Sequence, residues 1–296
     1  MVRRQSPVAC CTRVGFHPQR TTDNGRDRLL ARKPAKTTAF FHRSRSTAIA
    51  VFARAPRSGR AKTRLIPLLG PRGAAEFQAA LTVDALRKID ASPSRISRWL
   101  FLAGGKFPDF LPKGIRQAGG VRQGLPKQWR VEPQHGTDLG ERLDDAFRNL
   151  LRHHSAAVVI GTDSPLLPKR ILRTALAELR WCDAVLGPCP DGGFYLIGLR
   201  NLLSGLFRDV RWGTPWAFRD MLRTLIQRGL SCAILEPYPD VDRPTDFRAL
   251  ARHLVEHPGA RRLAPSVWKY TKPLMAGLVK GPGAGSSLRI GTLRVL

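Results

Sequence analysis

The sequence predicts an α/β protein built on a mostly parallel sheet, and three observations support this. The run 156–160 is apolar at every position, which is typical of a strand covered on both faces. Comparable runs at 47–53, 99–103 and 183–188 are separated by stretches with helical periodicity. Loops with charged or glycine residues follow several of these runs, where parallel sheets bind their ligands.

Asp163 follows the run 156–160 directly, in the segment Gly161-Thr162-Asp163-Ser164-Pro165. This places a carboxylate just beyond the carboxyl end of a buried strand, where such folds carry their chemistry. Asp is also a preferred N-cap, and Pro165 or Pro168 could open a helix. A functional carboxylate and a helix cap therefore both remain open.

The net charge of +28 lies mainly in the two ends of the chain. Residues 1–46 contain 11 Lys and Arg against 2 acidic residues, and residues 257–296 contain 7 against none. Neither end has sustained apolar periodicity, so we expect a disordered basic extension at 1–46 and a basic, Gly-containing tail at 257–296. The folded domain is expected at 47–256. No zinc-finger or RNA-binding pattern occurs, so no specific nucleic-acid partner is expected.

The composition also limits the setting of the protein. No stretch approaches the roughly 18 consecutive apolar residues that a membrane helix needs, so we expect no membrane span. The five cysteines are scattered without metal-ligand or redox spacing, which fits a reducing, cytoplasmic location. The basic leader has the composition of an organellar transit peptide, but we expect a non-functional extension.

The loop Arg54–Arg64 follows the first strand and contains five basic residues, Pro and Gly, but no acid. This indicates a phosphate cradle: backbone N–H groups near Gly59 can wrap phosphate oxygens, while Lys62 and Arg64 supply positive charge. The Walker spacing is absent. The alternative is a solvated basic turn.

The next elements are expected from periodicity alone. A helical pattern covers about 71–89, a strand 99–103 and a loop about 104–128. A helix then opens at Asp138, because Glu141 three residues later gives a capping-box spacing. Its apolar face is formed by Leu139, Leu143, Phe147 and Leu150.

The second half of the chain continues the alternation of strands and helices, with a helix at 169–180 and a strand at 183–188. Gly192 and Gly193 then permit positive φ and close approach of backbone to a ligand, with Asp191 at the turn. The same Asp-Gly-Gly is equally a hairpin signal. The next helix is expected to have Thr214 as N-cap and Pro215 at its first position.

A short strand at 231–235 leads to the segment Tyr238–Phe247, which carries several closely spaced carboxylates. Asp242 and Asp163 both lie just past strands, so the fold could bring them together as oxygen ligands of one Mg²⁺ or Mn²⁺. The alternative for Asp242 is a helix cap.

Several of these motifs together resemble one known family. They are Phe52-Ala53-Arg54-Ala55-Pro56, Gly59-Arg60-Ala61-Lys62-Thr63-Arg64-Leu65, Gln134 with Asp138-Leu139-Gly140-Glu141-Arg142, Gly161-Thr162-Asp163-Ser164-Pro165, Leu186-Gly187-Pro188 with Asp191-Gly192-Gly193-Phe194-Tyr195, and Asp240-Val241-Asp242 with Pro244 and Asp246. Over about residues 47–256 the chain resembles bacterial glycosyltransferases, often of arsenosugar biosynthesis, in the GT-A nucleotide-diphospho-sugar transferase superfamily. The resemblance implies a single three-layer α/β/α domain.

It also implies transfer of a sugar from a nucleotide-sugar donor to a small-molecule acceptor. In this interpretation Asp163, helped by Asp242, holds Mg²⁺ or Mn²⁺, and Arg54, Lys62 and Arg64 neutralise the diphosphate leaving group. Asp191 contacts sugar or acceptor hydroxyls. The nucleotide lies against the loops of Gly59, Gly192 and Gly193.

Two features keep other functions open. Where many such glycosyltransferases have Asp-x-Asp, this chain has Thr162-Asp163-Ser164, so one carboxylate of that motif is missing. The basic loop also resembles the Arg-Ala-Lys-x-Arg-Leu stretch of guanylyltransferases of cofactor biosynthesis, and nucleotidyltransferases share the Asp242-x-Pro244 ending. The alternatives are a nucleotidyltransferase acting on a phosphorylated small molecule, and a non-catalytic nucleotide-binding protein.

Overall fold

The computed structural model of the chain contains one eight-stranded sheet and describes residues 12–14, 46–90, 95–105 and 128–274. The strand order is β1-β8-β6-β7-β5-β2-β3-β4. The strands are β1 (Thr12–Val14), β2 (Thr47–Arg54), β3 (Ile96–Ala103), β4 (Trp129–Pro133), β5 (Ala156–Ile160), β6 (Ala184–Pro188), β7 (Phe194–Leu199) and β8 (Cys232–Ile234).

Most strand pairs are parallel, as the sequence predicts. Strand β2 pairs in parallel with β3 and β5, β3 with β4, and β6 with β8, whereas β7 is antiparallel to both β5 and β6. The carboxyl ends of β2, β5 and β6 therefore meet at one edge of the sheet, and the loops after them lie close together.

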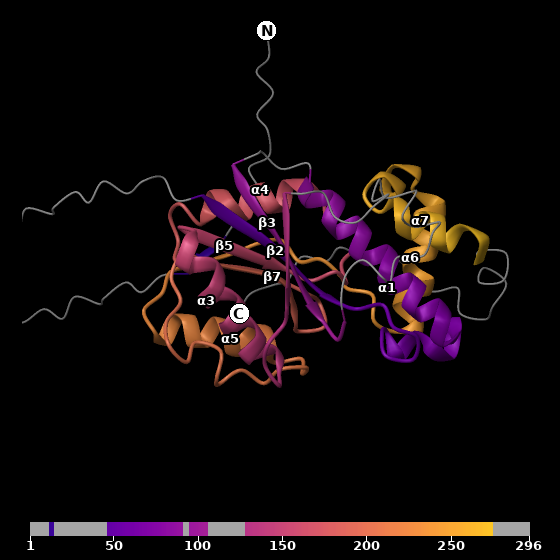
Figure 1. Cartoon of the computed structure of the whole chain (residues 1–296). Helices are drawn as coiled ribbons and strands as arrows, with labels where there is room; N and C mark the ends of the chain where they lie inside the picture. The colour runs from indigo at the N-terminus through magenta and orange to yellow at the C-terminus, as the bar shows by residue number, and fades with distance from the viewer. Residues whose placement is uncertain (1–11, 15–45, 91–94, 106–127, 275–296) are drawn as a thin grey trace, which may run out of the picture.

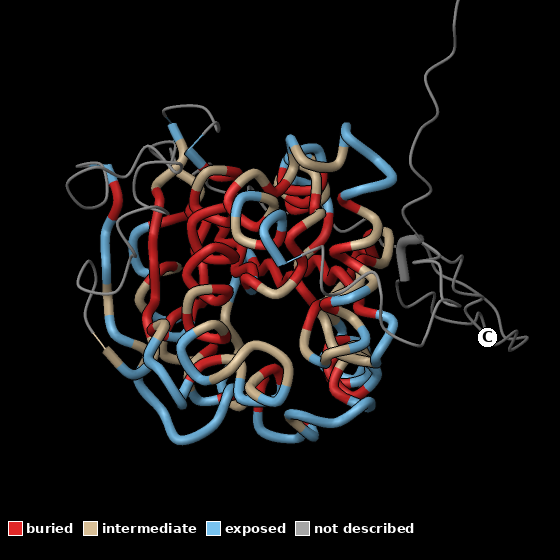
Figure 2. The backbone as a smooth tube through the Cα atoms, turned by 90° about the vertical axis from the view of Figure 1, so that its right-hand side faces the viewer, coloured by how far each residue is buried: buried red, intermediate tan, exposed pale blue. Residues whose placement is uncertain are grey.

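Helices cover both faces of the sheet and make the predicted three layers (Figure 1). On one face, α4 (Lys169–Glu178) and the C-terminal half of α1 (Ile66–Asp90) pack on Ile49, Val51 and other apolar strand residues. On the opposite face, α3 (Leu139–His153) and α5 (Ala217–Gln227) pack on Phe52, Phe101 and their neighbours. Figure 2 shows the buried strands surrounded by exposed loops.

A third apolar cluster lies beside the sheet, where α1 meets α6 (Pro244–Glu256) and α7 (Pro265–Thr271) (Figure 1). Phe77 of α1 packs edge-on against Phe247 of α6 at a ring-centroid distance of 4.9 Å. Helix α1 is kinked at Gly70, whose φ of 68° is the left-handed conformation that glycine tolerates best. The short 3₁₀ helix η1 (Thr63–Leu65) leads into α1.

The element boundaries differ from the expected ones in a few places. Strand β4 is not predicted, because Arg130 and Glu132 interrupt any apolar run and only Trp129 of its five residues is buried. Helix α5 begins at Ala217 rather than at Pro215, and the Thr214 hydroxyl oxygen instead accepts a hydrogen bond from the Trp216 N–H. The expected loop at about 104–128 lies mostly outside the described residues.

The predicted domain boundary at residue 256 is too early. After Glu256 the chain forms η2 (Pro258–Arg262), α7 and η3 (Lys272–Leu274), and Ala264 and Val267 are fully buried. Pattern analysis misses this because the segment is short and carries several basic residues. Strand β1 similarly lies inside the leader that the sequence predicts as disordered, and it pairs with β8. The rest of the leader and residues 275–296 lie outside the described part of the chain.

Truncation tests the structural role of the segment after Glu256. A protein ending at Glu256 is expected to melt well below the full chain, because the apolar cluster around Phe77 loses Val267 and the buried Asp84 loses its hydrogen-bond donors. A protein ending at Leu274 is expected to melt like the full chain. Thermal unfolding followed by circular dichroism measures both, and equal melting of the two truncated proteins would contradict a structural role for α7.

No helix among the described residues is both long and apolar enough to cross a membrane.

Candidate active site

Lys62 lies at the centre of the site, after the first strand of the large parallel part of the sheet. Its Nζ donates to Oδ1 of Asp242 at 2.6 Å and to the carbonyl oxygen of Val241 at 2.8 Å, and lies 2.7 Å from Oδ1 of Asp163. The Lys62 side chain is only 5% exposed. Its backbone adopts the left-handed conformation with φ of 46°, which aims the side chain at the two carboxylates at the cost of some local strain.

The structure therefore brings together Asp163 and Asp242, which the sequence predicts as neighbours. The structure also shows that neither carboxylate is the N-cap of the helix that follows it. The N-cap of α4 is Pro168, and that of α6 is Arg243, whose N–H donates to Asp246. Both carboxylates contact Lys62 instead, so capping does not account for them.

The sequence predicts a metal ion between Asp163 and Asp242, but in the structure the Lys62 ammonium lies between these two side chains. A divalent metal would need contacts of about 2.0–2.2 Å to these same oxygens. Such an ion would overlap Nζ, which lies 2.7 Å and 2.6 Å from them. As the side chains stand, these two aspartates do not fit a metal ion between them.

Lys62 is also restricted as a phosphate ligand. Burial lowers the pKa of its ammonium, but Asp163 and Asp242 raise it more, so the pKa lies above its usual value. All three ammonium protons have acceptors, in Asp163, Asp242 and Val241. In this arrangement Lys62 neutralises the carboxylates and has no proton left for a phosphate oxygen.

The other basic residues of the loop remain accessible. The Arg64 side chain is 63% exposed, with Nη1 3.7 Å from Oδ2 of Asp242. Arg54 is exposed and donates to the carbonyl oxygen of Arg60 at 3.4 Å. Gly59 has a φ of 73° and open space around its Cα. Arg64 thus joins the Lys62 cluster, whereas Arg54 forms no described contact with it.

The Asp191-Gly192-Gly193 turn connects β6 to β7 as a hairpin, which confirms one of its two predicted roles. Gly193 N–H donates to Oδ1 of Asp191 at 2.9 Å. Gly192 has a φ of 89°, and a Cβ there would overlap the Pro215 carbonyl group. Only glycine therefore fits at position 192, where the backbone packs against Pro215. Its predicted role in ligand binding stays a prediction.

Asp240 and Cys189 belong to the same region, although the sequence analysis does not select them as site residues. One potential ligand atom from each of Cys189, Asp191 and Asp240 lies within 4.8 Å of the other two. Burial, followed by repulsion from Asp191, Asp242 and Asp163, raises the pKa of Asp240 to about 7. The spacing Asp240-x-Asp242 is the only sequence signal that could have pointed to Asp240.

Buried polar residues of α1 hold the Asp163 loop in place. Gln78 Nε2 donates to the Thr162 hydroxyl at 3.1 Å, and that hydroxyl donates to Oδ1 of Asp163 at 3.2 Å. Lys88 Nζ donates to the carbonyl oxygen of Pro165 at 2.7 Å. These residues are missed from the sequence, where Gln78 and Lys88 look like ordinary polar positions of an amphipathic helix.

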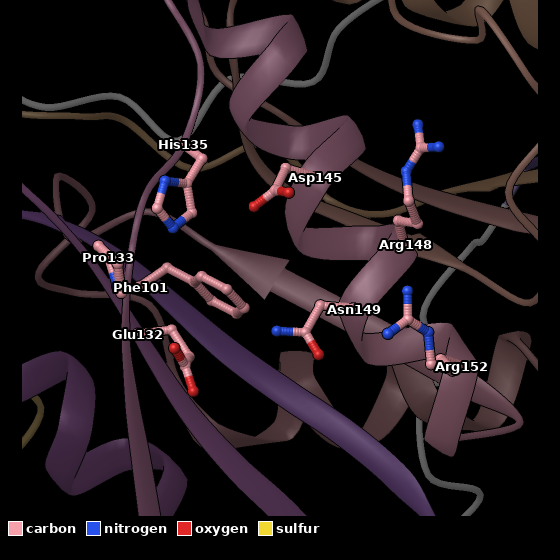
Figure 3. Close-up of a pocket in the computed structure, with 8 residues that line it drawn as sticks. All are labelled: Phe101, Glu132, Pro133, His135, Asp145, Arg148, Asn149 and Arg152. Carbon is pink, nitrogen blue, oxygen red and sulfur yellow. The ribbon is translucent and has the colours of Figure 1, made fainter.

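A separate cavity of about 250 Å³ lies between the β3–β4 edge and α3 (Figure 3). It is lined by Phe101, Glu132, Pro133, His135, Asp145, Arg148, Asn149 and Arg152. None of the predicted site residues lines it, so we do not place the chemistry there. The carboxylate cluster at the sheet edge has the more specific arrangement of charges.

The fold and the site define a class: an α/β protein with the nucleotide-diphospho-sugar transferase fold, carrying acidic and basic residues at the carboxyl edge of its sheet. Residues 94–214 match the family described as "Uncharacterized protein conserved in bacteria (DUF2064)". No protein of curated function matches the sequence.

One solved structure supports this class. A protein from Desulfovibrio desulfuricans G20, assigned as a nucleotide-diphospho-sugar transferase, is similar with 26% identity and a TM-score of 0.67, over 79% of this chain and 96% of that one. A cytidylyltransferase from Leptospira borgpetersenii has 14% identity and a TM-score of 0.48, over 81% of this chain and 99% of that one. The superfamily resemblance expected from the motifs is thus confirmed at the level of the fold.

Proposed function

We propose that this protein is a glycosyltransferase that uses a nucleotide-diphosphate sugar donor and a small-molecule acceptor. The observation that carries the proposal is the buried Lys62 between Asp163 and Asp242, in a loop that carries four further basic residues at the carboxyl edge of the sheet. An anionic diphosphate suits this edge, because the loop is basic and the nearest two carboxylates are already paired.

In the proposed reaction the oxygen of an acceptor hydroxyl attacks the anomeric carbon of the sugar as the bond from that carbon to the diphosphate oxygen breaks, and the hydroxyl proton passes to solvent. The leaving diphosphate gains charge, and in this proposal the exposed Arg64 and Arg54 neutralise it. Lys62 keeps Asp163 and Asp242 from repelling the donor. Asp191 accepts a hydrogen bond from a sugar or acceptor hydroxyl. The resemblance also implies a divalent metal, but no step is assigned to one at Asp163 and Asp242, where Lys62 lies.

The products of turnover test this proposal. A panel of UDP-, GDP-, ADP- and dTDP-sugars is expected to raise the melting temperature at least as much as the matching triphosphates, since a bound ligand stabilises the folded state. Turnover is expected to release nucleoside diphosphate, or to hydrolyse the donor slowly when no acceptor is present. Chromatography of the nucleotide products distinguishes these outcomes. Release of pyrophosphate from a triphosphate and a sugar phosphate, without diphosphate, would establish nucleotidyl transfer instead.

A further inference from the structure

Two carboxylates at the edge of the site lack a cationic partner. Among the residues that the structure describes, Asp191 and Asp240 form no ion pair, although Asp240 is half-buried. The Asp240 carboxylate also has no described hydrogen bond. A buried carboxylate without a partner is costly, and proteins commonly meet that cost with a cation.

Lys62 does not supply that cation. Its ammonium is fully used by Asp163, Asp242 and the Val241 carbonyl group. Asp240 lies two residues before Asp242 in the chain. Lys62 forms an ion pair with Asp242, whereas no described residue forms one with Asp240.

A second, independent observation also points to a ligand beside Asp240. The Ser164 side chain is only 8% exposed, and its hydroxyl has no hydrogen-bond partner of suitable geometry in the described structure. It lies beside the thiol of Cys189, which is 6% exposed. The Ser164 hydroxyl is thus a buried polar group without a hydrogen-bond partner, beside a thiol whose sulfur lies within 4.8 Å of carboxylate oxygens of Asp191 and Asp240.

We propose that Cys189, Asp191 and Asp240 bind one divalent transition-metal ion, while Lys62 remains the cation between Asp163 and Asp242. The three ligand atoms lie within 4.8 Å of one another, so small side-chain movements reach metal–ligand distances of about 2.0–2.3 Å. The sulfur binds as a thiolate, and its proton passes to solvent.

The donor set favours Co²⁺ or Zn²⁺ over Mg²⁺, and its two carboxylates also suit Mn²⁺. Carboxylate oxygens suit all of these ions, but a sulfur ligand suits transition metals, whereas Mg²⁺ prefers an octahedron of oxygen ligands. The proposal concerns the same site as the proposed glycosyl transfer. It is tested by metal binding to the protein alone, so either proposal can fail without the other.

Titration of the full chain with Mn²⁺, followed by the electron paramagnetic resonance of free Mn²⁺, tests the position of the ion. Asp240→Asn and Asp191→Asn are each expected to weaken binding by at least about tenfold, since even indirect partners of a metal are worth that much. Asp163→Asn is the matched control and is expected to change affinity much less. Asp240→Asn without metal should melt no lower than wild type, because it removes a buried unpaired charge.

Co²⁺ tests the sulfur ligand. Wild type with Co²⁺ is expected to show the near-ultraviolet charge-transfer absorption of a cobalt–thiolate bond, and Cys189→Ser is expected to lose it, while Cys182→Ser keeps it. Excess Mg²⁺ should not displace the Co²⁺. Full Mn²⁺ affinity in Asp240→Asn together with its loss in Asp163→Asn would overturn the proposed position, and an unchanged absorption band in Cys189→Ser would overturn the sulfur ligand.

Discussion

Replacing Lys62 by methionine is expected to reduce donor turnover by about 10²–10³-fold, which is the usual cost of removing one preorganised electrostatic group. Lys62 is the only described residue that contacts both Asp163 and Asp242. Without its charge these carboxylates repel each other and an approaching diphosphate. Steady-state kinetics with the donor found in the product assay measures the effect.

The fold is expected to survive this change. Asp163 and Asp242 have side-chain exposures of 44% and 36%, so water can solvate them once the ammonium is removed. The matched control is Arg60→Ala, which removes one positive charge from the exposed part of the same loop and should change turnover by less than about threefold. If Arg60→Ala reduced turnover as much as Lys62→Met, the total charge of the loop would matter, and the specific pairing of Lys62 would not.

The layered fold could be predicted because its strands are apolar at every position. Runs such as Ala156–Ile160 have few alternatives to a strand buried on both faces, and parallel strands place their following loops at one edge. That reasoning correctly brings Asp163 and Asp242 together. It does not identify what lies between them, because a basic loop that binds phosphate and one that pairs with carboxylates have the same composition.

The missed features depend on contacts between residues far apart in the sequence. Lys62 and Asp242 are separated by 180 positions, and the left-handed backbone at Lys62 has no local signal such as glycine. Asp84 likewise appears as one polar residue in a helix, although its partners are 182 and 183 positions away in α7. Periodicity detects a buried face, but not the buried polar partner that a distant segment supplies.

Asp84 provides the second large expected effect, which is on stability. Its Oδ1 and Oδ2 accept hydrogen bonds from the N–H groups of Ser266 and Val267 at 3.0 and 2.9 Å, at the start of α7. Burial raises the pKa of Asp84, and it lowers the pKa of the neighbouring Lys88 to about 8. Asp84→Ala removes the negative charge that raises the pKa of the buried Lys88, and it leaves two buried N–H groups without an acceptor.

We therefore expect Asp84→Ala to lower the free energy of unfolding by about 3–5 kcal/mol, because each of the two buried N–H groups left unsatisfied costs about 1–3 kcal/mol. Urea unfolding measures this, with Glu76→Ala as a control that removes an exposed helical ion pair and should cost about 0.5 kcal/mol or less. The double variant Asp84→Leu/Lys88→Met removes both charges, so it should be less destabilised than the sum of its single variants. Strict additivity would mean that Asp84 and Lys88 do not interact, and that the loss in Asp84→Ala comes from α7 alone.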